Sequence, residues 1–496
     1  MQLTTASLVF GLFCLLVHLE RTPTYTIDSY FYLSKAKQLA SGQGLRTTWN
    51  DGIDAKYFPG YSIALAPVSR PGKLYIIVQL IAYVVCGRLM IQIGRAAGRD
   101  SCGQFLALTA LLANPIMLKW LSLPMAEGVA LMLCLVAVAL FLAFLARRSI
   151  LSLILACVIG GFATITRIEA LFLVPVFGLL AAPEKRNISW RWLLAGLVVF
   201  FLPLFWYFLW LRGTAGAESA YISEFKSTLP TADFLKNLAY NILVPFGFMH
   251  WPVRSFSASE LLSVTGLAGV IWIGLGECVF VGGLVAALAG RLGPRLRATS
   301  ILFVTYAFVH SFWYYRYERF MLMALPLAAI VWASAIQEVC ARLLPKRQHV
   351  LLPLIQLMIV ASGFYFGNFY SLRHRAALQQ DTGGLRFREI AAAVNSLNSE
   401  SHSPVLTDLG PHLAYHLDAH TYLDTGYKNY WKRAFPPERT LGEMERLGIR
   451  FVVIKLKVNQ WFEEHAIPPE IQSRFKVLTE SGVSILEYTP GAVSDS

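Results

Sequence analysis

The sequence predicts a polytopic α-helical membrane protein with about eleven spans, followed by a small C-terminal soluble α/β domain. Hydrophobic residues make up 56% of the 496 residues and charged residues only 15%, whereas a soluble domain carries about 25% charged residues. The apolar residues gather in runs of roughly 17–25, the length that crosses a hydrocarbon core of about 30 Å. These runs stop near residue 371, where the composition changes to that of a soluble domain.

Each apolar run is expected to form one span. The expected spans are 3–19, 74–93, 103–118, 125–146, 150–166, 168–182, 191–211, 261–289, 299–313, 320–340 and 349–370. We expect the first run to be retained rather than cleaved as a signal peptide. No Lys or Arg precedes it, and no small-x-small site follows it.

The basic residues predict the orientation of the spans. Five alternate short loops hold thirteen Lys and Arg residues, and short basic loops face the cytoplasm. The N-terminus is therefore expected inside, in a plasma (inner) membrane. Loops 20–73 and 212–260 and everything after 370 are expected outside. The net charge of +13 then reflects mainly the basic cytoplasmic loops. No cluster of basic residues on a soluble face is found, so no nucleic-acid partner is expected. The seven cysteines lie in or beside spans and imply neither disulfides nor zinc.

The outside segments carry the remaining structural expectations. Residues 28–42 are expected to form a surface helix with Asp28 as N-cap and Ser41-Gly42 at its end. Residues 384–490 form the expected α/β domain. Its expected helices are 386–397, 441–447 and 461–475, the last interrupted at Pro468-Pro469. Its expected strands are 404–408, 450–457, 476–478 and 483–488.

Charged residues at the outer face are the candidates for function. A carboxylate at a membrane surface, such as that of Asp28, is a candidate functional group. Capping of a helix would by itself also explain an Asp at this position. Several basic residues lie on the expected outer side, where the positive-inside rule predicts few. Binding of an anionic lipid phosphate is one reason for a basic residue there. These basic residues are Lys56, Arg167, Arg316 and Arg319.

These cations and Glu127 also have structural explanations. Glu127 pairs with Lys119 or Arg167 in one alternative, and Arg167 pairs with Glu169 in another. Arg316 and Arg319 fit an aromatic belt, and Lys56 fits an interfacial lysine. Four histidines of the soluble domain have a weakly metal-like spacing, but a solvated surface explains them better. They are His402, His412, His416 and His420.

Four passages, in order, resemble the GT-C glycosyltransferases that use polyprenyl-phosphate sugars. This group contains the protein O-mannosyltransferases and the lipid A aminoarabinose transferases. The passages are Asp28-Ser29-Tyr30 through Gly44; Tyr57-Phe58-Pro59-Gly60-Tyr61; Asn114-Pro115 through Glu127 with Thr166-Arg167-Ile168-Glu169; and Tyr317-Glu318-Arg319-Phe320 through Pro326. The resemblance implies a GT-C-like transmembrane catalytic domain over 1–370 and an extracytoplasmic domain over 384–490.

The resemblance also implies an activity. The protein would transfer a sugar from a polyprenyl-phosphate donor to a hydroxyl of a glycan, lipid or protein, with inversion. Asp28 would be the general base, and Glu127 matches a second acidic position. Lys56, Arg167, Arg316 and Arg319 would hold the donor phosphate. The remaining substrate contacts would be Tyr57, Tyr61 and His250, the last of which is also a potential metal ligand.

One departure from the family and two rival functions stay open. Many relatives carry a second acid beside the first, where this chain has Ser29. We therefore assign no metal ligand and no certain cofactor, while a divalent metal remains open. A lipid or polysaccharide transporter or flippase would need polar residues along a path through the spans. A diphosphate-using polymerase or ligase would need paired acids.

Overall fold

The protein is described here from a computed structural model of the chain. It describes residues 12, 16, 26–50, 57–68, 75–96, 99–182, 188–215, 233–247, 258–312, 318–343, 345–348, 350–363, 365, 387–425, 433–455, 457–479 and 483–490. The expected first span lies almost wholly outside these residues.

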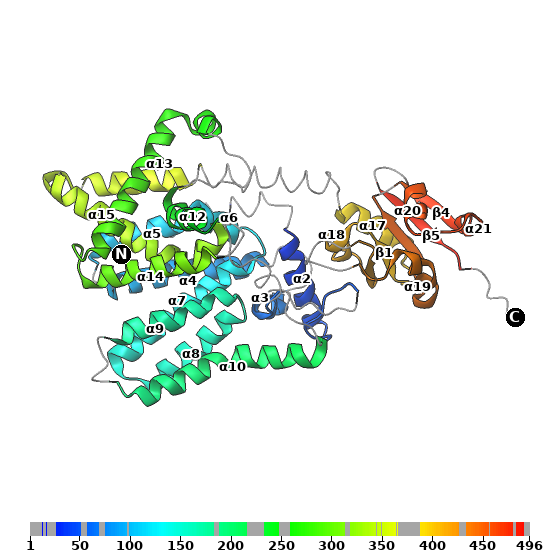
Figure 1. The fold of residues 1–496 in the computed structure, drawn as a ribbon, viewed down its shortest axis with the longest axis horizontal. Coiled ribbons are helices and arrows are strands. Elements are labelled where there is room, and N and C mark those ends of the chain that lie inside the picture. The colour runs from blue at the N-terminus through cyan, green and yellow to red at the C-terminus, as the bar shows by residue number, and fades with distance from the viewer. Residues whose placement is uncertain are drawn as a thin grey trace. The chain divides into compact units, whose positions relative to one another are not determined.

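The chain divides into two compact units, which are described separately (Figure 1). The membrane unit comprises Met1–Pro23, Pro71–Gly213 and Ile222–Arg375. The C-terminal unit comprises Thr24–Arg70, Thr214–Tyr221 and Ala376–Ser496. The loop segment 24–70 therefore belongs to the same unit as the C-terminal domain, although more than 300 residues separate them in the chain.

The membrane unit is built from helices. They are α4 (Tyr75–Ala96), α5 (Ser101–Leu112), α6 (Pro115–Leu121), α7 (Ala126–Arg147), α8 (Ile150–Thr164), η2 (Ile168–Phe172), α9 (Leu173–Ala181), α10 (Trp190–Ala215), α12 (Phe234–Gly247), α13 (Ala258–Leu288), α14 (Pro294–His310), η4 (Glu318–Ala324), α15 (Leu325–Leu343) and η5 (Pro345–Arg347). A further apolar helix covers Val350–Gly363.

Several of these helices are long and apolar enough to cross a bilayer. Among the described residues, five qualify singly: Tyr75–Ala96, Ala126–Arg147, Trp190–Gly213, Val270–Leu288 and Glu318–Leu343. Helices α5 and α6 pass the same test only as a pair, bent by 50° at the Asn114-Pro115 break, and they make a sixth span if the pair is counted as one. The chain is thus a multi-pass membrane protein, while the expected number of about eleven spans is met only in part.

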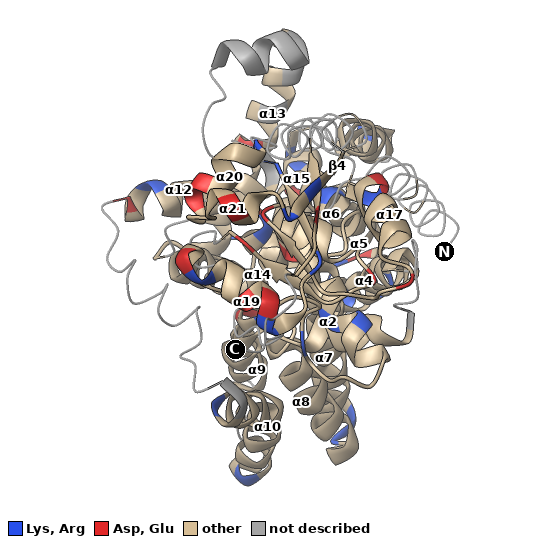
Figure 2. Ribbon diagram, turned by 90° about the vertical axis from the view of Figure 1, so that its right-hand side faces the viewer, with Lys and Arg blue, Asp and Glu red and all other residues tan. Residues whose placement is uncertain are grey.

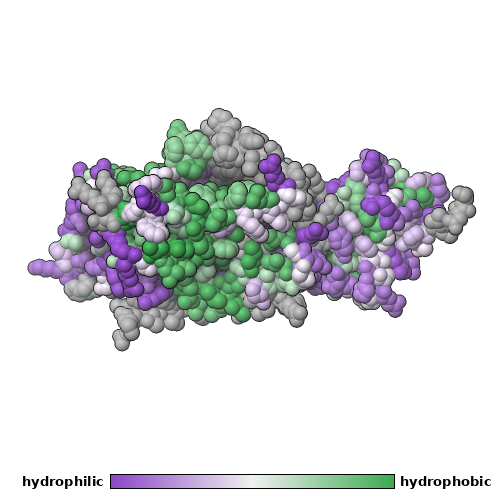
Figure 3. Space-filling model, turned by 90° about the horizontal axis from the view of Figure 1, so that it is seen from below, coloured by the Kyte–Doolittle hydropathy of each residue, from purple (hydrophilic) through white to green (hydrophobic). Residues whose placement is uncertain are grey.

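The surface of the membrane unit fits this assignment. Helix α10 carries Arg191 and Arg212 near its two ends and no charge between them, and α8 is uncharged throughout (Figure 2). Apolar side chains form a band over this unit, whereas the surface of the C-terminal domain is mostly hydrophilic (Figure 3). Helices pack closely where glycines permit it. A Cβ on Gly161 would lie 2.4 Å from the Phe200 carbonyl oxygen, and one on Gly363 would lie 1.9 Å from that of Ala113.

The C-terminal unit contains a five-stranded mixed sheet of order β2-β1-β3-β5-β4. Its strands are β1 (Val405–Thr407), β2 (Thr421–Leu423), β3 (Phe451–Ile454), β4 (Phe475–Thr479) and β5 (Ser484–Tyr488). Strand β1 pairs in parallel with β2 and β3, while β5 pairs antiparallel with β3 and β4. The expected strands and closing hairpin are present. Strand β2, with only three residues, was not expected from the sequence.

Helices cover both faces of this sheet. They are α17 (Phe387–Leu397), α18 (Gly410–Ala414), η6 (Pro437–Arg439), α19 (Thr440–Leu447), α20 (Val458–Glu464) and α21 (Pro469–Gln472). One apolar core contains Trp461, Phe462 and Leu486, and the other contains Phe387, Leu413 and Val453. The helical segment expected over 461–475 is interrupted before Pro469 as expected, although it starts earlier, at Val458, and its break is longer. The helix ends at Glu464, and a separate short helix begins at Pro469.

A buried ion pair lies in the first of these cores. The His465 Nε2 atom is 2.9 Å from Asp424 Oδ1, its Nδ1 atom is 2.8 Å from the Trp461 carbonyl oxygen, and the Trp461 indole donates to Asp424 Oδ2. Both ring nitrogens face acceptors, so both contacts are satisfied only when His465 is protonated. Burial alone would lower the pKa of His465, but the hydrogen bond and the charge of Asp424 outweigh burial and raise this pKa.

The loop segment 24–70 folds onto this domain through α2 (Ile27–Ala40), α3 (Gly60–Leu65) and η1 (Ala66–Val68). The expected N-cap is wrong, because Thr26 caps α2 by accepting a hydrogen bond from the Ser29 amide. Asp28 instead lies in the first turn, where the helix dipole favours a carboxylate. The helix ends as expected at Ser41, followed by Gly42 at φ +80°.

Candidate functional site

A buried carboxylate opens helix α7 of the membrane unit. Glu127 lies in the first turn of α7 and is 0% exposed. Its Oε1 atom accepts a hydrogen bond of 2.5 Å from Arg167 Nη1, and no hydrogen-bond partner of Oε2 lies among the described residues. Packing of α7 on α8 brings the two residues together, because Arg167 directly follows the end of α8. Of the two predicted pairings for Glu127, the one with Arg167 is confirmed and the one with Lys119 is wrong.

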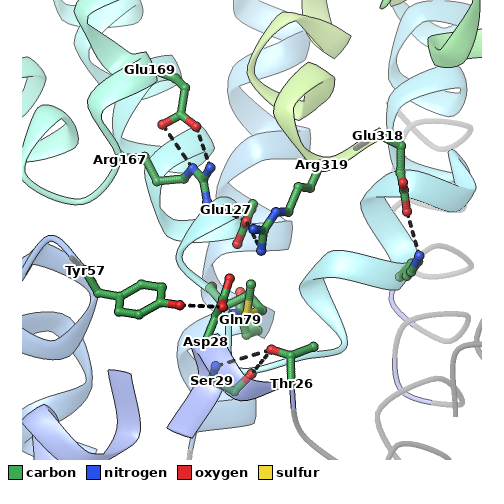
Figure 4. A network of polar contacts seen from close by, with 12 residues as sticks. Thr26, Asp28, Ser29, Tyr57, Gln79, Glu127, Arg167, Glu169, Glu318 and Arg319 are labelled. Carbon is green, nitrogen blue, oxygen red and sulfur yellow. Dashed lines mark hydrogen bonds and ion pairs between the residues drawn. The ribbon is translucent and has the colours of Figure 1, made fainter. Parts of the chain in front are cut away.

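Arg167 binds a second carboxylate in the same cluster (Figure 4). Its Nε and Nη2 atoms both donate to the carboxylate of Glu169 in η2, so the predicted Arg167–Glu169 pair is confirmed. The Arg319 guanidinium in η4 lies 3.8 Å from Glu127 Oε1, an ion-pair separation that is longer than a hydrogen bond. The Arg167 side chain is 7% exposed and that of Arg319 is 17% exposed. Arg319 is the more accessible of these two guanidinium groups.

A further ion pair joins α6 to η4. Lys119 Nζ lies 2.6 Å from Glu318 Oε1, and the Glu318 side chain is 5% exposed. Lys119 and Arg319 also stack on the Trp120 ring, at 4.8 and 5.5 Å from its centroid. We call these six charged residues the rim cluster: Lys119, Glu127, Arg167, Glu169, Glu318 and Arg319. The rim cluster contains three basic and three acidic side chains.

The start of α7 is held by a residue that sequence reasoning missed. Gln79 of α4 donates its amide hydrogens to the carbonyl oxygens of Leu123 and Met125, at 2.9 and 2.8 Å. A Cβ on Gly128 would lie only 2.6 Å from Gln79 Oε1. Gln79 is fully buried. The signal in the sequence that could have identified it is a polar residue inside the apolar span 74–93. Such residues are expected to bind backbone groups of a neighbouring helix.

An apolar cavity borders the rim cluster. It has a volume of about 80 Å³, and its lining includes Leu131, Leu135, Phe172 and Met323 together with Glu169. These residues come from α7, η2 and η4. The cavity therefore has one acidic residue in an otherwise mainly apolar wall.

Asp28 has its own partners in the C-terminal unit. The Tyr57 hydroxyl donates a 2.7 Å hydrogen bond to Asp28 Oδ1. Lys35, two helical turns after Asp28 on α2, donates a 2.6 Å hydrogen bond to the Tyr57 carbonyl oxygen and is 2% exposed. The Tyr57 ring also packs 4.7 Å from that of Phe31. Tyr57 is thus held at both ends by α2. Lys35 lies within the expected surface helix 28–42, and its buried hydrogen bond was not predicted.

The other predicted substrate contacts have different positions. Tyr61 is 0% exposed and packs edge-on against Tyr32, with ring centroids 5.2 Å apart. Its ring belongs to the packing between α2 and α3. Lys56, Arg316 and His250 lie outside the residues that the structure describes. Asp28 and the rim cluster belong to different units.

Two of the four C-terminal histidines contradict the predicted solvated surface. The rings of His412 and His416 lie 5.0 and 5.9 Å from that of Tyr30 on α2. The pKa of each is lowered to about 4, mainly by burial, and for His416 also by the positive charges of Arg388 and Lys37. Both rings are therefore neutral at pH 7. Within the described ranges, no group of three or more His, Cys, Asp or Glu residues is arranged to hold a metal ion.

Comparison with known proteins shows which structures this architecture resembles. No family model and no curated protein matches the chain. Two crystal structures of ArnT, a lipid A aminoarabinose transferase of the GT-C group from Cupriavidus metallidurans, are similar to it. The undecaprenyl-phosphate-bound structure has a TM-score of 0.64 at 12% identity, and the apo structure 0.62 at 14%. Each comparison covers 98% of this chain and 99% of ArnT. The chain therefore has the fold of the GT-C membrane glycosyltransferases.

Proposed function

We propose that this protein is a glycosyltransferase that uses a polyprenyl-phosphate sugar. It would transfer the sugar to a hydroxyl acceptor at the extracytoplasmic face of a plasma (inner) membrane. In this proposal the N-terminus is cytoplasmic and the C-terminal domain extracytoplasmic. The fold alone does not imply an activity, so the proposal depends on the chemistry of the residues.

The rim cluster is the observation that carries the proposal. Charged groups are costly inside a membrane bundle, and such residues usually mark a functional site. Here Glu127 is completely buried, and Arg167 is bound by two carboxylates. This network fixes the guanidinium groups before any ligand arrives. Fixed cations in a site of low dielectric stabilise a developing phosphate charge better than mobile ones.

The donor would bind with its phosphate at Arg319 and its polyprenyl chain along apolar surface. Arg319 is the more exposed guanidinium, so it would contact the phosphate directly, while Arg167 would orient Glu127. Lys56 and Arg316 would add positive charge. The mainly apolar cavity beside Glu169 fits the part of the lipid nearest its phosphate.

The acceptor hydroxyl would be activated by Asp28. Its oxygen attacks the anomeric carbon as the bond from that carbon to the phosphate oxygen breaks. The phosphate leaves with the bonding electron pair as polyprenyl phosphate, and the hydroxyl proton passes to Asp28. A single displacement of this kind inverts the configuration at the anomeric carbon. The Tyr57 hydrogen bond would orient the carboxylate, while Glu127 and His250 would contact the sugar or the acceptor.

Purified protein and defined donors test this function. The full-length enzyme would be incubated with radiolabelled polyprenyl-phosphate sugars and a membrane extract as the source of acceptor. We expect transfer that is abolished in Asp28→Asn, a variant that keeps the size of the side chain but cannot accept the proton. Full activity of Asp28→Asn would refute the base assignment. Absence of transfer from every monophosphate donor would refute the function.

A further inference from the structure

The helix that carries Asp28 is built into the C-terminal domain through two independent contacts. The first is an aromatic cluster around Tyr30, which is 3% exposed. Its ring centroid lies 5.0 Å from that of His412 and 5.7 Å from that of Tyr415. His412 in turn stacks on Phe387 of α17, with the rings 5.2 Å apart. The cluster therefore joins the first turn of α2 to the apolar core of the sheet.

The second contact extends the sheet itself. Trp49 forms an isolated parallel bridge with Thr421 of the edge strand β2. The Asn50 amide donates to the Thr421 carbonyl oxygen at 2.9 Å, and Asn50 Oδ1 accepts from the Leu423 amide at 2.8 Å. Asn50 has φ +49°, a left-handed conformation that Asn adopts more readily than most residues. Its side chain thus completes the edge of a sheet formed more than 350 residues later.

The same loop segment is tied back to α2. The Thr48 amide donates to Ser34 Oγ at 2.7 Å, and the Trp49 ring lies 5.1 Å from that of Phe31. Tyr30 and Asp28 lie on different sides of the helix, since two residues correspond to about 200° of rotation. One side of α2 is consequently held by the C-terminal domain, while the other presents Asp28 to Tyr57.

We propose that Tyr30, His412 and Asn50 are positioning residues that set the place of Asp28 through the C-terminal domain. The domain then acts as the scaffold of the first loop, in addition to any contact with the acceptor. This inference rests on the proposed function, because it assigns these residues to the same reaction. A displacement of about 1 Å in a catalytic group costs about 10²-fold in rate. Loss of one contact is expected to lower kcat by about 10- to 100-fold.

Matched variants of Asn50 provide the first test. Asn50→Gly keeps the left-handed backbone but removes the oxygen that accepts from Leu423. Asn50→Asp keeps both the conformation and the acceptor oxygen. In the donor assay we expect Asn50→Gly to lower kcat with little change in the donor KM, and Asn50→Asp to restore it. Amide exchange over 27–40 should rise in Asn50→Gly alone.

A second pair separates positioning from a general loss of stability. Tyr30→Leu removes the ring that contacts His412, whereas Tyr30→Phe retains it. Phe462→Leu weakens the core on the other face of the same sheet, away from α2. We expect kcat to fall only in Tyr30→Leu. This pair also decides the matter if Asn50→Gly does not fold.

The outcomes separate the two proposals. Wild-type kcat in both Asn50→Gly and Tyr30→Leu, with an inactive Asp28→Asn, would overturn the positioning role and leave the function standing. An equal fall of kcat in Phe462→Leu would also overturn it, because the effect would then be general. An active Asp28→Asn would instead overturn the function on which the inference rests.

Discussion

Replacing Asp424 by Asn is expected to reverse the pH dependence that the buried ion pair gives to the C-terminal domain. In the wild-type protein, His465 is protonated between Asp424 and the Trp461 carbonyl oxygen, and its pKa is raised. The stability from this pair is fully present below the unfolded-state pKa of about 6.5. It is lost as the pH rises through the folded-state pKa.

The Asn variant keeps the hydrogen bonds but not the charges. Its amide oxygen can accept from the Trp461 indole, and its amide nitrogen can donate to Nε2 of a neutral His465. The folded variant then holds His465 neutral, while the unfolded chain binds a proton below pH about 6.5. Stability should therefore fall by about 1.4 kcal/mol for each pH unit below this value. This is a shift of roughly 5 °C or more in unfolding temperature for a domain of about 100 residues.

Thermal unfolding of the detergent-solubilised protein between pH 5.5 and 8.5 measures this effect. The variant should be most destabilised relative to wild type at the acidic end. Tyr488→Phe removes a hydrogen bond to Glu445 in the same domain without contacting His465, so its curve should run parallel to that of wild type. A parallel curve for Asp424→Asn as well would refute the conclusion that His465 is charged in the folded protein.

Four further perturbations test the candidate site and its support. Lys35→Met removes the buried donor to the Tyr57 carbonyl oxygen, so kcat in the donor assay should fall about tenfold or more. Lys35→Arg keeps a donor and should retain part of the wild-type kcat. Arg319→Gln should lower kcat/KM for the donor at least about tenfold without loss of folded protein. In contrast, Arg167→Gln leaves the buried Glu169 without its cation and Glu127 with only the more distant Arg319. It should cost about 3–5 kcal/mol, visible as a lower unfolding temperature. Gly128→Ala should destabilise by about 1–3 kcal/mol through overpacking, whereas Gly178→Ala, whose Cβ meets nothing within 4 Å, should not; equal unfolding temperatures would contradict this.

Local patterns in the sequence predicted local structure well. The helix 28–42 and the strands of the closing hairpin follow from spacing and from end signals such as Ser41-Gly42. The ion pair of Arg167 with Glu169 was also accessible, because only one residue separates them. The strand β2 was missed because three residues carry too little periodicity. Its position depends on pairing with β1 rather than on its own composition.

Long-range contacts could not be predicted in this way. Whether Glu127 pairs with Lys119 or Arg167 depends on how α7 packs on α8 and where η4 lies. The spacing of residues along the sequence determines neither of these. Likewise, Thr26 rather than Asp28 caps α2 because the chain enters the helix two residues earlier than the hydrophobic pattern indicates. The sequence predicts a surface position for His412. The prediction is wrong because Tyr30, which packs against His412, lies in a loop distant in the chain.

The join between Asn50 and β2 also has a consequence for biosynthesis. Asn50 and Leu423 are 373 residues apart in the chain. At about 5–20 residues per second, β2 is synthesised roughly 20–75 s after the first loop. During that interval the Tyr30 ring lacks its His412 partner and Asn50 lacks its strand. The loop that carries Asp28 thus acquires its final form only near the end of translation, after the intervening spans have been made.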